Sequence, residues 1–175
     1  MSGIRINKTL ILLFLVSSFI LAQESDNKKY DDAKEEDILF GLISEDDFQD
    51  KDFSLWYNPE YEEYTVDSLT IANIKEELTD VKIVLVMGTW CHDSHREVPR
   101  FIKILKYADY DFSNLTIYAV DGEKEAGIEG FHKYDIKFVP TFIIYNQETE
   151  IGRIIEAPEN TLEEDLASIL LSNLK

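Results

Sequence analysis

The segment at residues 88–99, GTWCHDSHREVP, holds the side chains best suited to chemistry. Within it, Cys91 follows an apolar run at residues 82–87 and stands at the start of a pattern typical of a helix. The first backbone N–H groups of a helix have no partner inside it and carry partial positive charge, which stabilises a thiolate relative to a thiol. An accessible thiolate is a nucleophile, so we predict thiol chemistry at Cys91.

Cys91 is also the only cysteine among the 175 residues. The chain can therefore form no internal disulfide and no cysteine-rich zinc site, and any thiol chemistry needs a second molecule. A single cysteine is often an inert, buried side chain. We favour the reactive interpretation because Trp90 and the polar residues His92, Asp93 and Ser94 indicate a surface turn.

Two histidines follow the cysteine and raise the alternative of a metal site. Cys91, His92 and His95 lie on one short segment, and residues four apart share a helix face. No fourth ligand lies nearby in the sequence, so we predict no metal and no other cofactor. The histidines either favour the thiolate when protonated or are ordinary exposed polar residues, and both interpretations stay open.

Regular patterns surround this segment and predict the elements that position it. The run KIVLVM at 82–87 predicts a strand buried on both faces, and the residues after Cys91 predict a helix with one apolar face. Residues 115–120 predict a second strand, 122–134 are weakly helical at best, and 141–145 with 150–155 predict a hairpin. A capping-box pattern at 161–164 begins a closing helix. The order β-α-β-α-β-β-α predicts an α/β fold with a mixed four- to five-stranded sheet and helices on both faces.

The first 80 residues divide into three segments by composition. Residues 1–22 have a basic start followed by a short apolar run, which is typical of a secretory signal peptide and less so of an uncleaved anchor. Residues 23–37 are almost wholly polar and are predicted to be an acidic, flexible tether. Residues 38–80 are predicted to be an N-terminal extension packed on a domain at 81–175, with a helix at 66–78. We therefore expect an extracytoplasmic, periplasmic or secreted protein.

The charge balance excludes two classes of partner. The chain carries 35 acidic and 17 basic side chains, for a formal net charge of -18. Nucleic acids and anionic membrane surfaces are polyanions, and their binding requires clustered Lys and Arg. We predict no nucleic-acid partner and, after signal cleavage, no membrane partner.

Two motifs resemble the thioredoxin superfamily. Residues 90–94, WCHDS, look like the WCxxC active site of that superfamily with Ser94 in place of the second cysteine. Residues 134–141, YDIKFVPT, resemble the segment that ends in a cis proline opposite the active cysteine, and Gly152 stands where the family has glycine in its last strand. The pattern Cys91-x-x-Ser94-x-x-Glu97-x-Pro99 is similar to extracytoplasmic thioredoxins of the TlpA and ResA type.

The resemblance implies a thioredoxin fold and a set of site residues. It implies that Cys91, Ser94 and Glu97 are catalytic, and that substrate is bound by Trp90, His92, Val139 and Pro140. It also implies a cis Val139–Pro140 bond beside Cys91. Protein thiols or disulfides, and a dithiol reductant, are the partners that it suggests.

Two departures from the superfamily pattern limit what the site can do. Leu85 stands where cytoplasmic thioredoxins have a buried aspartate that moves protons. The resemblance to the ResA type implies that Glu97 takes part of that role. Ser94 cannot release a bound substrate, because a hydroxyl is not ionised at physiological pH and so does not attack a mixed disulfide. Ser94 can still donate a hydrogen bond to the Cys91 thiolate.

Three functions are compatible with these residues. We predict a monothiol thioredoxin-like oxidoreductase that forms mixed disulfides through Cys91, resolved by an external thiol or by a thiol of the substrate. The alternative is a non-catalytic protein that keeps the fold and binds extended peptides. A cluster-binding role like that of monothiol glutaredoxins is disfavoured because the negative charge opposes an anionic tripeptide such as glutathione.

Overall fold

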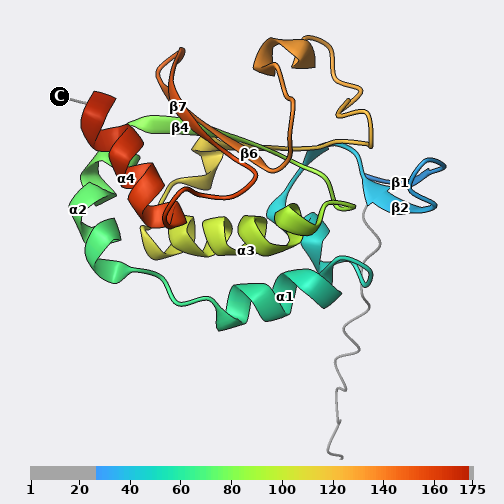
Figure 1. Cartoon of the computed structure of the whole chain (residues 1–175), viewed down its shortest axis with the longest axis horizontal. Coiled ribbons are helices and arrows are strands. Elements are labelled where there is room, and N and C mark those ends of the chain that lie inside the picture. Colours follow the sequence, from blue (N-terminus) through green and yellow to red (C-terminus); the bar gives the residue numbers. More distant parts are fainter. Residues whose placement is uncertain (1–26, 174–175) are drawn as a thin grey trace, which may run out of the picture.

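The computed structural model of the protein describes residues 27–173, with a five-stranded sheet at its centre (Figure 1). The predicted signal segment, 1–22, and residues 23–26 lie outside the described residues. The strand order is β3-β5-β4-β6-β7. The strands are β3 Gly41–Ile43, β4 Val81–Met87, β5 Leu115–Ala119, β6 Thr141–Asn146 and β7 Thr149–Ile155. Among the strands of residues 27–173, β4 and β5 are the one pair that runs parallel, which confirms the predicted mixed sheet.

The α-helices of the described residues pack on one face of this sheet. They are α1 Ser54–Glu63, α2 Ser68–Leu78, α3 His92–Tyr107 and α4 Leu162–Asn173. Each contributes buried side chains to one apolar cluster that also includes Leu85 of β4. The opposite face is covered by a short 3-10 helix, η3 Phe131–Tyr134, with the loops on either side of it. The predicted weak helix at 122–134 is therefore reduced to η3.

Strand β4 shows why the apolar run before Cys91 is continuous. Ile83 and Leu85 belong to the cluster under the α-helices, whereas Val84 and Val86 belong to the cluster under η3. Successive side chains of a strand point to opposite faces, so a strand covered on both sides has no exposed row. This burial confirms the sequence prediction for 82–87 and places the end of β4, and with it Cys91, at one edge of the core.

The prediction of a flexible tether at 23–37 is wrong for residues 28–37. Strand β1 Lys28–Asp31 pairs antiparallel with β2 Glu36–Leu39, and the resulting hairpin projects beside the sheet (Figure 1). Ile38 and Leu39 anchor it because both are fully buried. An ion pair also holds the hairpin on the domain, since the Lys28 ammonium lies 3.3 Å from the buried carboxylate of Asp50. Composition alone did not predict these pairings, because the partners lie elsewhere in the chain.

The segment between this hairpin and β4 packs on the domain, as predicted. It supplies the edge strand β3, the 3-10 helix η1 Glu45–Gln49, and the helices α1 and α2. Phe48 and Tyr57 stack with ring centroids 4.8 Å apart and lie in the same apolar cluster as α3. The helix predicted at 66–78 begins two residues later, at Ser68, because the carboxylate of Asp67 caps its first N–H groups.

Ion pairs join this N-terminal segment to α3. Arg100 Nη2 lies 2.5 Å from Glu60 of α1, and Lys106 Nζ lies 2.6 Å from Glu45 of η1.

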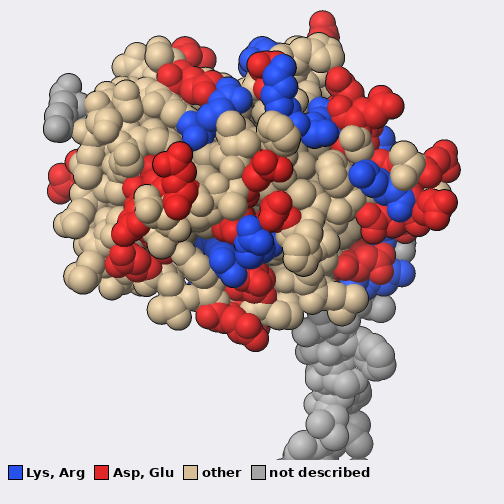
Figure 2. All heavy atoms as spheres, in the orientation of Figure 1, with Lys and Arg blue, Asp and Glu red and all other residues tan. Residues whose placement is uncertain are grey.

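Acidic side chains are spread over the face shown in Figure 2, with basic side chains among them. No helix within residues 27–173 combines the length and the apolar character needed to cross a membrane.

Candidate active site

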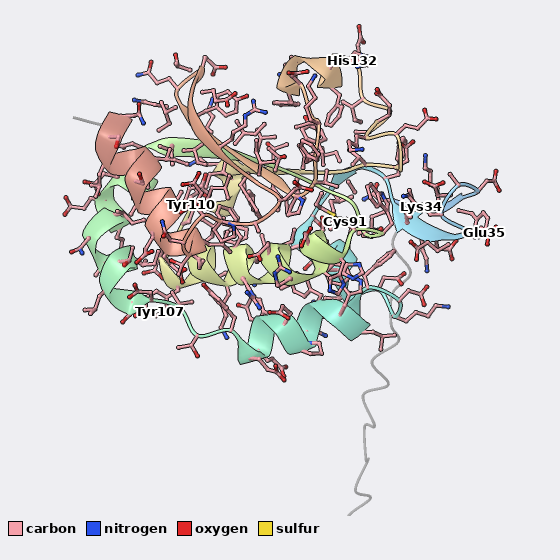
Figure 3. All side chains as sticks on the ribbon, in the orientation of Figure 1. Lys34, Glu35, Cys91, Tyr107, Tyr110 and His132 are labelled. Carbon is pink, nitrogen blue, oxygen red and sulfur yellow. The ribbon has the colours of Figure 1, made fainter. Side chains whose placement is uncertain are left out.

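Cys91 lies at the N-cap of α3, where β4 has ended and the helix begins (Figure 3). Its backbone N–H donates to the carbonyl of Gly88 at 3.0 Å, which closes a tight turn between strand and helix. Its own carbonyl accepts from the N–H of His95 at 3.1 Å. The side chain is half-buried, and its thiol is free. The partly buried Cys91 side chain therefore lies at the N-terminal end of a 16-residue helix.

The segment before β6 faces this sulfur. Cys91 Sγ donates to the carbonyl oxygen of Val139 at 3.1 Å, although the two residues are 48 positions apart. The Val139–Pro140 peptide bond is cis, as predicted. The Pro140 carbonyl accepts from the N–H of Glu156 at 2.7 Å, which ties this segment to the end of β7. Cys91 and the proline segment therefore form one site, which the resemblance to thioredoxins implied.

Trp90, next to Cys91 in the same turn, is held by contacts with two other parts of the chain. Its indole N–H donates to the carbonyl of Val120, at the end of β5, at 2.9 Å. The ammonium of Lys34, from the turn of the β1–β2 hairpin, lies 4.0 Å from the centre of the indole ring. Gly88 is required below it because a Cβ atom there would lie 2.6 Å from the indole.

Ser94 is fully buried, and the structure gives its hydroxyl a different partner from the predicted one. Its Oγ accepts from the backbone N–H of Gly88 at 3.3 Å. This contact links the first turn of α3 to the end of β4. In the structure the hydroxyl therefore holds the turn, and its predicted hydrogen bond to the Cys91 thiolate stays a prediction for the ionised state.

Glu97 is nearly fully buried, with 3% of its surface exposed. Its carboxylate lies 2.5 Å from Nε of Arg96, whose Nη2 pairs with Asp93 at 2.9 Å. The hydrogen bond that Arg96 donates to Glu97 raises the pKa of Arg96, because it stabilises the charged guanidinium. Glu97 is thus placed in a charged network on the first two turns of α3, and its part in proton transfer stays a prediction.

The two histidines after Cys91 have different surroundings. His92 is exposed, and its ring lies 6.3 Å from that of His95. His95 stacks on Trp56 of α1, with ring centroids 4.3 Å apart, and its Nε2 lies 2.5 Å from the carbonyl oxygen of Thr89. Trp56 and Thr89 were missed by the sequence analysis, because no spacing pattern relates Trp56 to a helix 36 positions further on.

Comparison with known proteins agrees with this geometry. No protein-family model matches the chain. A curated protein of Alternaria alternata, Thioredoxin AMT13, is 28% identical over 108 residues, which cover 58% of this chain and 86% of that protein. The chain has a thioredoxin-like fold. We base this assignment on the mixed sheet, the cis proline opposite Cys91 and the match to the Alternaria protein, which together support the thioredoxin superfamily.

Solved thioredoxin structures are more distant in sequence. The thioredoxin of Aeropyrum pernix is 19% identical with a TM-score of 0.37, and the alignment covers 57% of this chain and 82% of that one. The thioredoxin of Fasciola hepatica is 19% identical with a TM-score of 0.37, covering 58% of this chain and 88% of that one.

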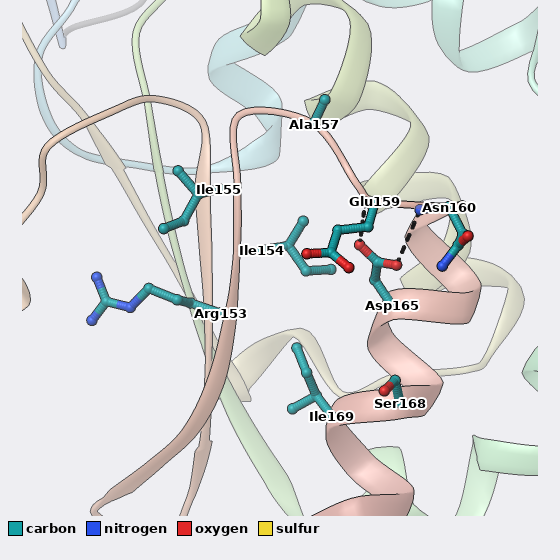
Figure 4. A pocket seen from close by; sticks show the side chains of 9 residues that line it. All are labelled: Arg153, Ile154, Ile155, Ala157, Glu159, Asn160, Asp165, Ser168 and Ile169. Atoms are coloured by element: carbon teal, nitrogen blue, oxygen red, sulfur yellow. Dashed lines mark hydrogen bonds between the residues drawn. The ribbon is translucent and has the colours of Figure 1, made fainter.

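Within residues 27–173, no group of three His, Cys, Asp or Glu side chains is arranged to hold a metal ion. A pocket of about 360 Å³ lies between β7 and α4, where the carboxylate of Asp165 accepts from the backbone N–H groups of Glu159 and Asn160 (Figure 4). Cys91 does not line this pocket, so it is separate from the candidate active site.

Proposed function

We propose that the protein is a monothiol thioredoxin-like thiol–disulfide oxidoreductase of the extracytoplasmic TlpA and ResA type. One observation carries this proposal: the sulfur of the partly buried Cys91, at the start of α3, lies 3.1 Å from the backbone carbonyl next to the cis proline. A nucleophile and a backbone edge that can receive an extended chain thus lie side by side.

The first step is a thiol–disulfide exchange that conserves electrons. The Cys91 thiolate attacks one sulfur of a substrate disulfide, forms a new S–S bond, and releases the other substrate sulfur as a thiolate. One disulfide is consumed and one is formed, so no external oxidant or reductant is needed. Trp90, His92, Val139 and Pro140 are proposed to contact the substrate during this step.

The second step needs a thiol that this chain does not contain. An external thiol can attack the Cys91 sulfur of the mixed disulfide and release reduced substrate, and a second external thiol then regenerates Cys91 as a thiolate and leaves as an oxidised pair. A thiol of the substrate can instead attack the substrate sulfur and form a rearranged disulfide. We propose protein thiols or disulfides as substrates and a dithiol as the reductant.

We also propose that the protein works outside the cytoplasm, with residues 1–22 removed. The support is the basic start and the short apolar run of these residues. Mass spectrometry of the protein from its native cells tests this proposal. A mature chain that begins at Gln23 is expected, and a chain that retains its first 22 residues in the cytosol would contradict it.

The activity is tested by trapping the covalent intermediate. The wild-type chain is incubated with an oxidised protein that contains one accessible disulfide, quenched in acid, and analysed by intact mass. We expect an adduct equal to the sum of the two masses, which is lost on reduction. Cys91→Ser is the matched control and should give no adduct.

A second outcome separates the alternative function. If the wild-type chain binds extended peptides without forming an adduct, even where a thiol reagent reaches Cys91, the protein is a peptide-binding protein on a thioredoxin-like fold. The oxidoreductase proposal is then wrong.

A further inference from the structure

Thr89, two residues before Cys91, is held by its side-chain hydroxyl and by its backbone carbonyl. Its side-chain oxygen accepts from the backbone N–H of Leu39, at the end of the β1–β2 hairpin, at 3.1 Å. Its carbonyl oxygen lies 2.5 Å from Nε2 of His95. Thr89 is nearly fully buried, so both contacts replace hydrogen bonds that water would otherwise supply.

The contact identifies Nε2 as the donor nitrogen of the His95 ring. A carbonyl oxygen only accepts hydrogen bonds, so Nε2 must carry the proton and donate it. Because Nε2 donates to the residue just before Trp90, the side chain of His95 closes a loop between the first turn of α3 and the end of β4. The backbone N–H of Cys91 closes the same turn through Gly88 at 3.0 Å.

A second contact, on the face of the ring, orients His95. Trp56 of α1 stacks on His95 with an interplanar angle of 13°. Trp56 is itself packed edge-on against Phe48 and Tyr57, at centroid distances of 5.9 and 6.0 Å. The indole therefore has a fixed place, and the N-terminal segment determines the plane of the His95 ring.

We propose that His95 is a positioning residue for Cys91, and that Trp56 sets the orientation of its ring. This inference rests on the proposed function, because it concerns the reaction of Cys91 with an extended disulfide substrate. His95 does not touch the reacting sulfur atoms. It holds the 88–91 turn so that the Cys91 sulfur stays opposite Val139, where an extended substrate must place its own sulfur.

This role predicts a difference between large and small substrates. An extended peptide that pairs with the 139–140 segment can offer its sulfur in few orientations, so a displaced Cys91 reacts slowly with it. A small disulfide approaches the sulfur from many directions and is little affected by the same displacement. Misplacement by about 1 Å can cost up to about a hundredfold in rate for an oriented reaction.

The test compares two probes with the same leaving group. One is methyl 2-pyridyl disulfide, and the other is an extended ten-residue peptide whose single cysteine carries the same 2-pyridyl group. Release of pyridinethione gives a second-order rate for each. We expect His95→Leu, which keeps bulk beneath Trp56 but loses the donor, to lower the peptide rate about tenfold relative to the methyl rate.

Two further variants separate positioning from general destabilisation. His95→Gln keeps an N–H donor and should restore the ratio of the two rates to within about threefold of the wild type. Trp56→Leu removes the stacking partner but leaves His95 intact, and it should lower the ratio in the same direction as His95→Leu. Thermal unfolding of each variant shows that the rates are measured on folded protein.

The outcomes distinguish this proposal from the proposed function. If the wild-type chain reacts with the peptide through Cys91 and His95→Leu leaves the ratio unchanged, the positioning role is wrong and the oxidoreductase proposal stands. The positioning role is equally wrong if His95→Gln behaves like His95→Leu. If the wild-type chain reacts with neither probe, the proposed function is wrong. Hydrogen exchange at the Cys91 backbone N–H then tests the positioning role without any reaction. The role predicts faster exchange in His95→Leu than in His95→Gln, and equal rates would contradict it.

Discussion

Ser94 and Cys91 are separated by three positions on the first turn of α3, and only one of them carries a thiol. The Ser94 hydroxyl is fully buried and bonded to the backbone N–H of Gly88, so it contributes to the turn and cannot act as a second nucleophile. A site with two cysteines releases its substrate from the mixed disulfide by attack of the second thiol. In this chain a thiol of another molecule must perform that attack.

The variant Ser94→Cys replaces one oxygen atom with sulfur and tests whether the missing second thiol is what prevents release of the substrate. The second sulfur lies on the same helical turn as Cys91, so it can attack a mixed disulfide from within the chain and release the substrate. We expect the lifetime of the mixed disulfide to fall at least about tenfold, and the variant, which has two free thiols when reduced, to have none after it releases the substrate. Thiol counting and intact mass after quenching measure both. A variant that stays in mixed disulfides as long as the wild type would show that more than the second sulfur is missing.

The residues that the sequence predicted correctly are those that adjoin in the chain or belong to a recognisable motif. Cys91 was placed at the helix start because its neighbours determine that turn, and the cis bond before Pro140 followed from the resemblance. The stacking of Trp56 on His95 was not predictable, because it depends on how α1 crosses α3.

At the scale of elements, the β1–β2 hairpin and α1 surround the 88–91 turn. The predicted tether is a hairpin because Lys28 and Asp31 find partners far away in the sequence. Asp31, nearly fully buried, accepts hydrogen bonds from the backbone N–H groups of Ala33 and Gly122. Local polarity suggested disorder, whereas long-range pairing supplies the order, and such pairing is invisible to a composition argument.

Phe40 of the N-terminal segment contacts the loop after β5, and alanine substitutions at two glycines of that loop test this contact. Gly127 has a φ of +65°, and a Cβ atom there would lie 2.6 Å from the ring of Phe40. Gly130 has a φ of +78°, with nothing within 4 Å of such an atom. Both alanine variants carry backbone strain of about 1–2 kcal/mol, but only Gly127→Ala must also displace Phe40, at an added cost of about 1–3 kcal/mol.

Urea unfolding measures this difference. Gly127→Ala should have the lower free energy of unfolding of the two variants. Equal destabilisation would show that Phe40 does not pack against this loop in solution.

At the scale of the whole molecule, buried tyrosines make the free energy of unfolding depend on pH in the alkaline range. Tyr57 and Tyr110 are 2% and 6% exposed, and burial raises the pKa of both phenols. Above pH about 10 the unfolded chain loses these protons while the folded chain retains them, so the unfolded state binds fewer protons. Stability therefore falls as pH rises, by about 1.4 kcal/mol per pH unit for each tyrosine.

The tyrosine contribution is isolated by removing the phenol. Urea unfolding between pH 9 and pH 11 should show a smaller loss of stability in Tyr57→Phe and in Tyr110→Phe than in the wild type. The same slope in all three proteins would contradict the assignment of these protons.

The central claim is that Cys91 carries out half of a thiol–disulfide exchange and that a second molecule supplies the other half. The most direct measurement is the lifetime of the isolated mixed disulfide between the wild-type chain and a substrate that has no second thiol. We predict that it persists in buffer and that added dithiol releases the substrate together with the Cys91 thiol. Release in buffer without any added thiol, or failure of the adduct to form, would contradict the claim.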